Sequence, residues 1–349
     1  MSDSDGGHDR RFVDAWRSSG MDVSAPDLRG VQDSSGALLR EIEDFAPDVT
    51  QVGPLTGRSA ELVLKHWNGP LISTSWGYDL LLDAETSERA REIAIKALEL
   101  ADLVFVDSVA TNEAAVRIGV DPRIIATFPW GLDPEWLNLP AHRPLGPDPT
   151  FLSIRRHDPM YRVEDALEAF LAIAPSYPQS QLVIAGNGSL TPGLVERAMS
   201  SRSAAQVRFV GELSPAELRQ WMADADAYVS ASVVDGTSVS LLEAMAAGLP
   251  VVVSDIPGNA AWVGEATGHT FPTGDVHALS RVMNDFCTQS SGFAEDAARR
   301  ASQATLAIRE NANWQQTSTR FAEYALRAIE SHERKRDGRA ASDSGQAGE

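Results

Sequence analysis

The sequence has little cysteine, little lysine and no long apolar segment. Its 349 residues include a single cysteine, Cys287, which excludes an internal disulfide and a cysteine-cluster metal site. No apolar run approaches the roughly 20 residues that a membrane-spanning helix needs. The first residues, MSDSDGGHDRR, are polar and acidic, so we expect no secretory signal and a cytoplasmic location.

Lysine occurs only three times, so nearly all cationic side chains are arginines. The formal net charge of −19 argues against general affinity for nucleic acid. The composition, 43% apolar and 23% charged, is that of a soluble globular protein. A chain of this length fits two domains better than one hydrophobic core.

Short apolar strands alternate with helices along the whole chain, which is typical of parallel sheets covered by helices. In the first half we predict helices at 8–20, 34–45, 87–101 and 111–118, and strands at 70–75, 103–106 and 124–128. In the second half we predict strands at 150–154, 181–185, 207–210, 227–230 and 250–254, and helices at 275–289 and 293–330, the latter interrupted near 311–314.

This alternation predicts an α/β protein with two Rossmann-like domains, residues 1–136 and 150–305. The proline-rich residues 137–149 lack periodicity and are interpreted as the linker. Residues 306–331 are expected to form a C-terminal helix. The charged tail at 332–349 is expected to be disordered.

The block from Asp235 to Val252, DGTSVSLLEAMAAGLPVV, carries the strongest functional signal. A predicted strand ends in a loop with Asp235 and Gly236, and a helix then begins at Thr237 or Ser238. The free N–H groups and the positive dipole end of such a helix form an anion site. Glu243 lies one to two turns inside the helix, so both acids can accept hydrogen bonds from sugar and ribose hydroxyls. The alternative is an amphipathic helix with solvated acids.

This block resembles the acid-x7-acid block of retaining GT-B glycosyltransferases, glycosyltransferase family 4 or glycosyl transferases group 1. The usual first glutamate is replaced by Asp235, as in a subgroup with the block DGTSVSLLEAMA. The resemblance implies two domains facing across a cleft, with Asp235 on the sugar and Glu243 on the ribose. It also implies a donor site formed by Gly236, Thr237, Ser238, Val239 and Ser240, with no metal and no cofactor.

A second motif, Ser153–Arg162, follows the first strand of the second domain. In the family, an arginine and a lysine at this turn hold the donor diphosphate and stabilise the leaving group. The subgroup pattern points to Arg155, whereas the commoner pattern points to Arg156. Tyr161 stands about where the lysine would be, and His157 or Arg162 could supply the second charge. The alternative is a solvated basic turn.

Three weaker matches keep the same order along the chain. Asn187 and Gly188 belong to a glycine turn that resembles the one after the family's second strand. Phe209, Gly211 and Leu213 resemble the segment that contacts the nucleotide base. The segments DIPGN at 255–259 and GHTFP at 268–272 complete the family's pattern. In addition, Trp314 resembles the aromatic position where the last helix crosses back to the first domain.

The first domain matches the family less fully. Gly6, Gly7 and His8 resemble the glycine loop near donor and acceptor, yet the strand expected before them is missing or shortened. Trp76 stands where many relatives have a histidine, so Asp79 is the alternative polar group on the acceptor or donor-sugar side.

Together these features predict a hexosyltransferase that moves a sugar from a nucleoside diphosphate sugar to a hydroxyl acceptor, in polysaccharide or glycoconjugate biosynthesis. The alternative is a catalytically inactive nucleotide-sugar-binding partner of a polysaccharide assembly complex. The helix at 8–20 carries arginines beside Phe12, Val13 and Trp16. This stripe either touches the inner membrane surface peripherally or packs on the domain's own sheet.

Overall fold

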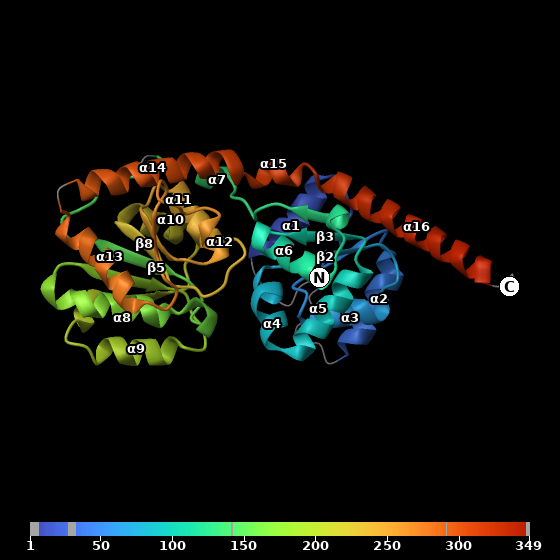
Figure 1. Cartoon of the computed structure of the whole chain (residues 1–349), viewed down its shortest axis with the longest axis horizontal. Coiled ribbons are helices and arrows are strands. Elements are labelled where there is room, and N and C mark those ends of the chain that lie inside the picture. The colour runs from blue at the N-terminus through green and yellow to red at the C-terminus, as the bar shows by residue number, and fades with distance from the viewer. Residues whose placement is uncertain (1–6, 27–32, 141, 291, 347–349) are drawn as a thin grey trace. The chain divides into compact units, whose positions relative to one another are not determined.

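The computed structural model describes residues 7–26, 33–140, 142–290 and 292–346, with side chains described from residue 9 to residue 337 (Figure 1). The chain divides into two compact units. Unit 1 comprises Met1–Pro129 and Gln315–Glu349, and unit 2 comprises Trp130–Trp314. Among the described residues, no helix is long and apolar enough to cross a bilayer.

Unit 2 is a parallel sheet between two layers of helices. Within the described residues its six strands lie in the order β10-β9-β8-β5-β6-β7, and every pair is parallel. The strands are β5 (Thr150–Ile154), β6 (Gln181–Ala185), β7 (Val207–Gly211), β8 (Ala227–Ser230), β9 (Val251–Ser254) and β10 (His269–Phe271). The longer helices are α8 (Val163–Ile173), α9 (Thr191–Met199), α10 (Pro215–Asp224), α11 (Val239–Ala246), α13 (Val276–Thr288) and α14 (Phe293–Asn311), and the short ones are α7 (Pro134–Leu137) and α12 (Pro257–Ala260).

Alternating side chains on the strands of unit 2 face two separate cores. Phe151 packs with α8 and α13 on one face, whereas its neighbour Leu152 packs with α11 and α14 on the other. Figure 1 shows α8 and α9 on one side of this sheet and α10, α11 and α14 on the opposite side. The five strands predicted for this half are confirmed, and β10 is an addition.

Unit 1 holds a smaller parallel sheet. Within the described residues its four strands lie in the order β1-β2-β3-β4. The strands are β1 (Thr50–Val52), β2 (Leu71–Thr74), β3 (Leu103–Val106) and β4 (Ile125–Thr127). The helices are α1 (Gly7–Ser18), α2 (Ser34–Phe45), α3 (Arg58–His66), α4 (Ala84–Thr86), α5 (Glu88–Leu100), α6 (Val109–Ile118) and α16 (Phe321–Gln346), which follows α15 (Trp314–Ser318). The residues before Gly7 are not described, so the expectation that the family's first strand is missing or shortened stays a prediction.

Aromatic side chains join α1, β3 and α16 on one face of the unit 1 sheet. Phe12 and Trp16 are buried, and their ring centres lie 6.3 and 6.4 Å from that of Phe105. Phe321 of α16 packs on Trp16 at 4.6 Å. The apolar stripe of α1 therefore packs on its own sheet.

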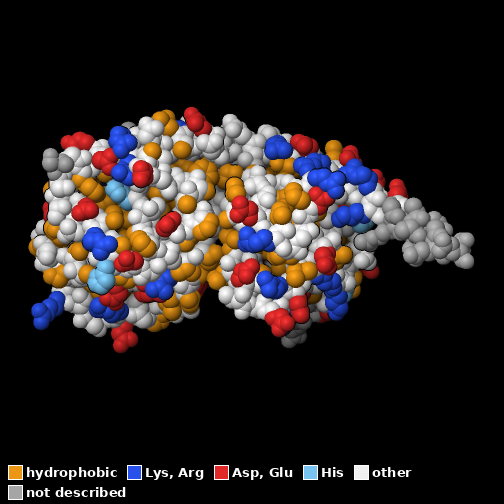
Figure 2. Space-filling view, viewed as in Figure 1, with side chains coloured by type: hydrophobic (Ala, Val, Ile, Leu, Met, Phe, Trp, Pro, Cys, Tyr) orange, Lys and Arg blue, Asp and Glu red, His pale blue; other side chains and the backbone are white. Residues whose placement is uncertain are grey.

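The end of the chain differs from the prediction. Residues 332–346 were expected to be disordered, but α16 continues to Gln346. His332 and Lys335 both reach the buried carboxylate of Asp102, and these long-range contacts tie the helix to unit 1. On the face shown in Figure 2, basic and acidic side chains are interspersed over the surface of each unit.

Candidate functional site

Two loops of unit 2 meet where the direction of the strand order reverses. From β5 the chain proceeds to β6 and β7 on one side, whereas β8, β9 and β10 lie on the other side. The loops that follow β5 and β8 therefore both start at the carboxyl ends of neighbouring strands, where open α/β sheets bind ligands. The first loop begins with Arg155 and the second carries Asp235.

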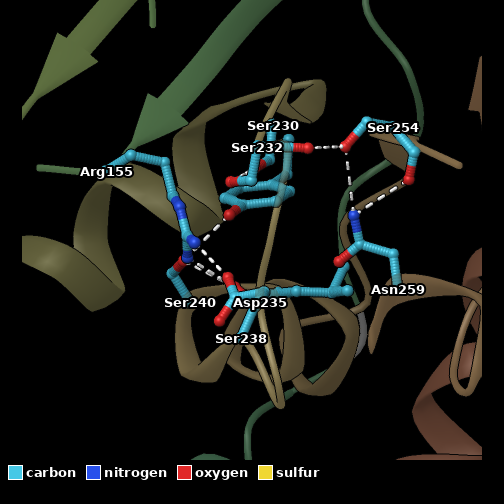
Figure 3. A network of polar contacts seen from close by, with 10 residues as sticks. Arg155, Ser230, Ser232, Asp235, Ser238, Ser240, Ser254 and Asn259 are labelled. Carbon is cyan, nitrogen blue, oxygen red and sulfur yellow. Dashed lines mark hydrogen bonds and ion pairs between the residues drawn. The ribbon is translucent and has the colours of Figure 1, made fainter. Parts of the chain in front are cut away.

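Arg155 connects these two loops through its guanidinium group. Nη1 donates hydrogen bonds to Ser238 Oγ at 2.6 Å and to Ser240 Oγ at 3.2 Å, and Nη2 forms an ion pair with Asp235 (Figure 3). The ring centre of Tyr161 lies 4.3 Å from the guanidinium carbon. Only 8% of the Arg155 side chain is exposed.

The electrostatic surroundings keep Arg155 charged. Burial alone lowers its pKa, but the neighbouring groups together, foremost the charge of Asp235, outweigh burial, so the pKa is raised above its usual value. Among the described residues, Arg155 Nε is buried without a hydrogen-bond partner. One N–H of this cation is therefore left unpaired inside the protein.

The N-terminus of α11 lies beside this cation. Ser238 is the N-cap residue, and its Oγ accepts a hydrogen bond from the backbone N–H of Leu241. The predicted helix start is thus confirmed. Ser240 also bonds Tyr228 Oη at 2.8 Å. Glu243 lies three residues after Ser240, so the two share a face of α11. Thr237 is buried, and the side chains of Val239 and Glu243 are half-buried.

A cavity of about 620 Å³ opens within unit 2 beside Arg155. Its volume is in the range of small-molecule sites. Among the predicted residues it is lined by Arg155, Arg156, Asn187, Gly188 and Leu213, and the other lining residues are Ile154, Tyr161, Ala185, Gly186, Glu212 and Leu218. The cavity thus follows the carboxyl ends of β5, β6 and β7.

The predicted glycine turn forms one wall of the cavity by lying against backbone. A Cβ at Gly186, where φ is +114°, would lie 2.2 Å from the carbonyl oxygen of Arg155. A Cβ at Gly188 would lie 2.6 Å from the carbonyl oxygen of His157. The backbone N–H of His157 donates to the Asn187 carbonyl at 3.1 Å. The turn therefore fixes the chain that follows Arg155.

Two residues of the predicted base-binding segment do not line this cavity. Phe209 packs edge-on against His157, with ring centres 6.4 Å apart. The Gly211 carbonyl accepts a hydrogen bond from the backbone N–H of Gly186 at 2.8 Å. Both residues support the glycine turn, whereas Leu213 and the unpredicted Glu212 reach the cavity.

The structure decides between Arg155 and Arg156, a choice that the sequence left open. Arg155, and not Arg156, contacts Asp235, because the Arg156 side chain is 73% exposed and pairs with Asp158 at 2.9 Å. Arg162 pairs with Asp165 through two hydrogen bonds of 2.5 and 2.8 Å.

His157 is not the expected second cation. Its side chain is buried with Nδ1 2.8 Å from Thr191 Oγ1, and burial lowers its pKa below the ordinary 6.5. The ring is therefore neutral near pH 7.

Asp79 also differs from the prediction that it faces a ligand. It is fully buried and accepts hydrogen bonds from the backbone N–H groups of Leu55 at 2.8 Å and Leu80 at 2.9 Å and from Ser75 Oγ at 2.5 Å. Burial raises its pKa, against the effect of these hydrogen bonds. Asp79 therefore joins the loops that follow β1 and β2, a role that depends on tertiary contacts.

Trp76 lines a separate cavity of about 610 Å³ within unit 1. The walls of this cavity are mainly apolar side chains of α1 and α2 together with the edge of β1. Gly6 lies outside the described residues, and Gly7 and His8 begin α1 with side chains that are not described. Their predicted roles stay predictions. Among the described residues, no cluster of three or more His, Cys, Asp or Glu side chains could hold a metal ion.

Comparisons with known proteins agree with this architecture. Residues 137–305 match the family model of glycosyl transferases group 1. Glycogen synthase of Mycobacterium tuberculosis is 32% identical over 167 residues, 48% of this chain and 39% of that protein. Phosphatidyl-myo-inositol mannosyltransferase of Propionibacterium freudenreichii is 26% identical over 209 residues, 54% of this chain and 51% of that protein. The chain thus matches only about two fifths to half of the length of these relatives.

Solved structures show the fold. Anabaena Alr3699/HepE in complex with UDP-glucose matches with a TM-score of 0.72 and 18% identity, covering 92% of this chain and 89% of that chain. Sucrose-phosphate synthase from Thermosynechococcus elongatus matches with a TM-score of 0.67 and 19% identity, covering 86% and 79%. The chain has the GT-B fold with two Rossmann-like units, and residues 137–305 are similar to glycosyl transferases group 1.

Proposed function

We propose that this chain, with its glycosyl transferases group 1 domain, is a retaining hexosyltransferase that uses a nucleoside diphosphate sugar and a hydroxyl acceptor. The observation that carries the proposal is the meeting of Arg155, Asp235 and the N-terminus of α11 at the switch point of the unit 2 sheet. A cation, hydroxyl groups and a carboxylate there can hold a diphosphate beside a sugar.

Arg155 and the first turn of α11 would bind the diphosphate. The guanidinium is buried, permanently charged and oriented by Ser238 and Ser240, so little reorganisation is needed when negative charge grows on the leaving group. The nucleoside would extend into the 620 Å³ cavity towards Leu213. No metal or cofactor is required in this proposal, because the cation and the helix N-terminus supply the positive field.

The carboxylates would hold the hydroxyl groups. Asp235, 17% exposed, would accept from the transferred sugar, and Glu243 would accept from the ribose. Retention of configuration is carried over from the family resemblance. The acceptor would be a glycan, a glycolipid or a small molecule. The relatives include a glycogen synthase and an Acholeplasma laidlawii alpha-monoglucosyldiacylglycerol synthase, and a lipid acceptor would bring the chain to a membrane surface.

A donor screen tests the proposal. The full chain is incubated with UDP-, GDP- and ADP-glucose, and nucleotide binding and slow donor hydrolysis are measured. We expect at least one donor to be bound and hydrolysed. Arg155→Lys keeps the charge but loses the planar fork, so it should weaken binding strongly. Arg197→Lys is the matched control, since Arg197 pairs with Glu168 on the surface.

Asp235→Asn should abolish hydrolysis while the folded chain still binds the nucleoside diphosphate. The proposal fails if the folded wild-type chain binds none of the three nucleotides. Binding without any hydrolysis or transfer would instead indicate an inactive nucleotide-sugar-binding protein.

A further inference from the structure

The segment that follows β9 lies against the loop that carries Asp235. Residues 231–238 connect β8 to α11, and residues 255–260 form the turn after β9 together with α12. Figure 3 shows Ser254 and Asn259 beside Ser232, on the side of this network away from Arg155. The hydrogen bonds of Arg155 go to Ser238, Ser240 and Asp235, so this segment does not contact the cation of the proposed site through them.

Hydrogen bonds fix the base of the loop. Ser254 Oγ donates to the carbonyl oxygen of Ser232 at 2.5 Å, and Asn259 Nδ2 donates to the carbonyl oxygen of Ser254 at 2.9 Å. All three residues are at most 2% exposed. Buried hydrogen bonds of this kind hold a backbone in one arrangement because an unpaired group would remain desolvated.

A close backbone approach fixes the position of Asp235 itself. A Cβ built at Gly258 would lie 2.2 Å from the carbonyl oxygen of Asp235 and 2.5 Å from that of Gly236. Both neighbouring atoms are backbone, so no side-chain rotation could make room. Any residue other than glycine at this position would displace the loop or the turn.

We propose that Gly258 and Asn259 are positioning residues for Asp235. Gly258 allows the turn to support the Asp235 backbone, and Asn259 with Ser254 anchors the start of the same loop at Ser232. The Asp235 carboxylate is thereby held where it meets Arg155. This inference rests on the proposed function, in which that carboxylate holds the transferred sugar.

Gly258→Ala tests the inference, with Gly264→Ala as the control because a Cβ at Gly264 would meet no atom within 4 Å. Turnover is measured with the best-bound of UDP-, GDP- and ADP-glucose, and affinity is measured for that donor and for its bare nucleoside diphosphate. We expect Gly258→Ala to lose turnover roughly a hundredfold, as misplacement by about 1 Å does. Affinity for the donor should fall, and affinity for the bare nucleotide should stay unchanged. Gly264→Ala should behave as wild type.

A second variant keeps the test decisive if Gly258→Ala does not fold. Asn259→Asp has nearly the same shape but faces the Ser254 carbonyl with an acceptor, so it should show the same selective loss. Asn284→Asp is its control, because Asn284 uses its side-chain oxygen to accept from Tyr177. Adding either positioning variant to Asp235→Asn should cause little further loss of donor affinity, since both act on one group.

Several results would overturn the inference. One is wild-type turnover in both variants, and another is an equal loss of affinity for the donor and the bare nucleotide. A ligand-free crystal structure of Gly258→Ala should show the Asp235 carboxylate displaced from Arg155, and an unmoved carboxylate would also overturn it. Failure of the wild-type chain to bind any of the three nucleotides would overturn the proposed function instead, while the crystal structure would still decide the positioning role.

Discussion

Nη1 of Arg155 lies 2.6 Å from Oγ of Ser238, the residue that caps the N-terminus of α11. One hydroxyl therefore serves two groups, because it also accepts from the backbone N–H of Leu241. The cation and the positive end of the helix dipole are brought to the same place. Their mutual repulsion is offset by the carboxylate of Asp235, which pairs with the same guanidinium.

Ser238→Ala should separate the two functions of this hydroxyl. Loss of a serine N-cap costs about 1 kcal/mol of stability. Loss of the acceptor for Arg155 should also weaken nucleoside diphosphate binding roughly tenfold, the equivalent of one hydrogen bond. Thermal unfolding and calorimetric titration measure the two effects.

Ser87→Ala is the matched control for this variant. Ser87 caps α5 in unit 1 and accepts from the backbone N–H of Ala90. We expect it to lose a similar amount of stability and no nucleotide affinity. Equal affinity losses in the two variants would contradict a role for the contact between Ser238 and Arg155 in nucleotide binding.

His157 should make stability depend on pH. Burial lowers its pKa in the folded chain below the ordinary 6.5, so the unfolded chain binds more protons between these two values. The stability that His157 contributes is therefore complete above pH 6.5 and is lost as pH falls through the lowered pKa. Urea unfolding between pH 5.5 and 7.5 measures the slope.

His157→Gln should flatten this slope only in part, because burial also lowers the pKa of His269. The control is His277→Gln, since His277 is exposed on α13. An unchanged slope in His157→Gln would show that the imidazole is not held neutral.

The sequence predicted the local structure around Ser238 because these residues are close in the chain. The helix start at Ser238 and the positions of Asp235 and Glu243 follow from one continuous block with recognisable spacing. Arg155 could be placed at a strand end for the same reason. Choosing Arg155 over Arg156 required knowing which side chain turns towards the β8 loop, and this is a long-range property.

The errors concern polar residues whose role depends on burial. Asp79 and His157 stand beside predicted ligand-contacting positions, yet the fold encloses both. No spacing rule shows that Asp79 will accept a hydrogen bond from Leu55, 24 residues earlier. Gly258 belongs to the weak family match at 255–259, but its role could not be predicted, since that role depends on backbone atoms of another loop.

The contacts between α16 and Asp102 also join residues far apart in the sequence, and they give a prediction about stability. Asp102 is 2% exposed, and its carboxylate accepts from His332 Nδ1 at 2.9 Å and pairs with Lys335 Nζ at 3.1 Å. Lys335→Met should lower the free energy of unfolding measurably, because a buried carboxylate would lose its lysine partner. Arg334→Met, one residue earlier, is the control, since its pair with Glu330 is exposed on both sides and should contribute little.

Truncation after Ser331 extends this comparison to the whole end of α16. A disordered tail could be removed without effect. Removal of a tail that is docked through His332 and Lys335 should instead reduce stability at least as much as Lys335→Met does. Urea unfolding of the full chain and the truncated chain decides between the two. Loss of a partner from a carboxylate as buried as Asp102 should cost stability. An unchanged unfolding midpoint in both the truncated chain and Lys335→Met would therefore show that these contacts do not hold α16 in place.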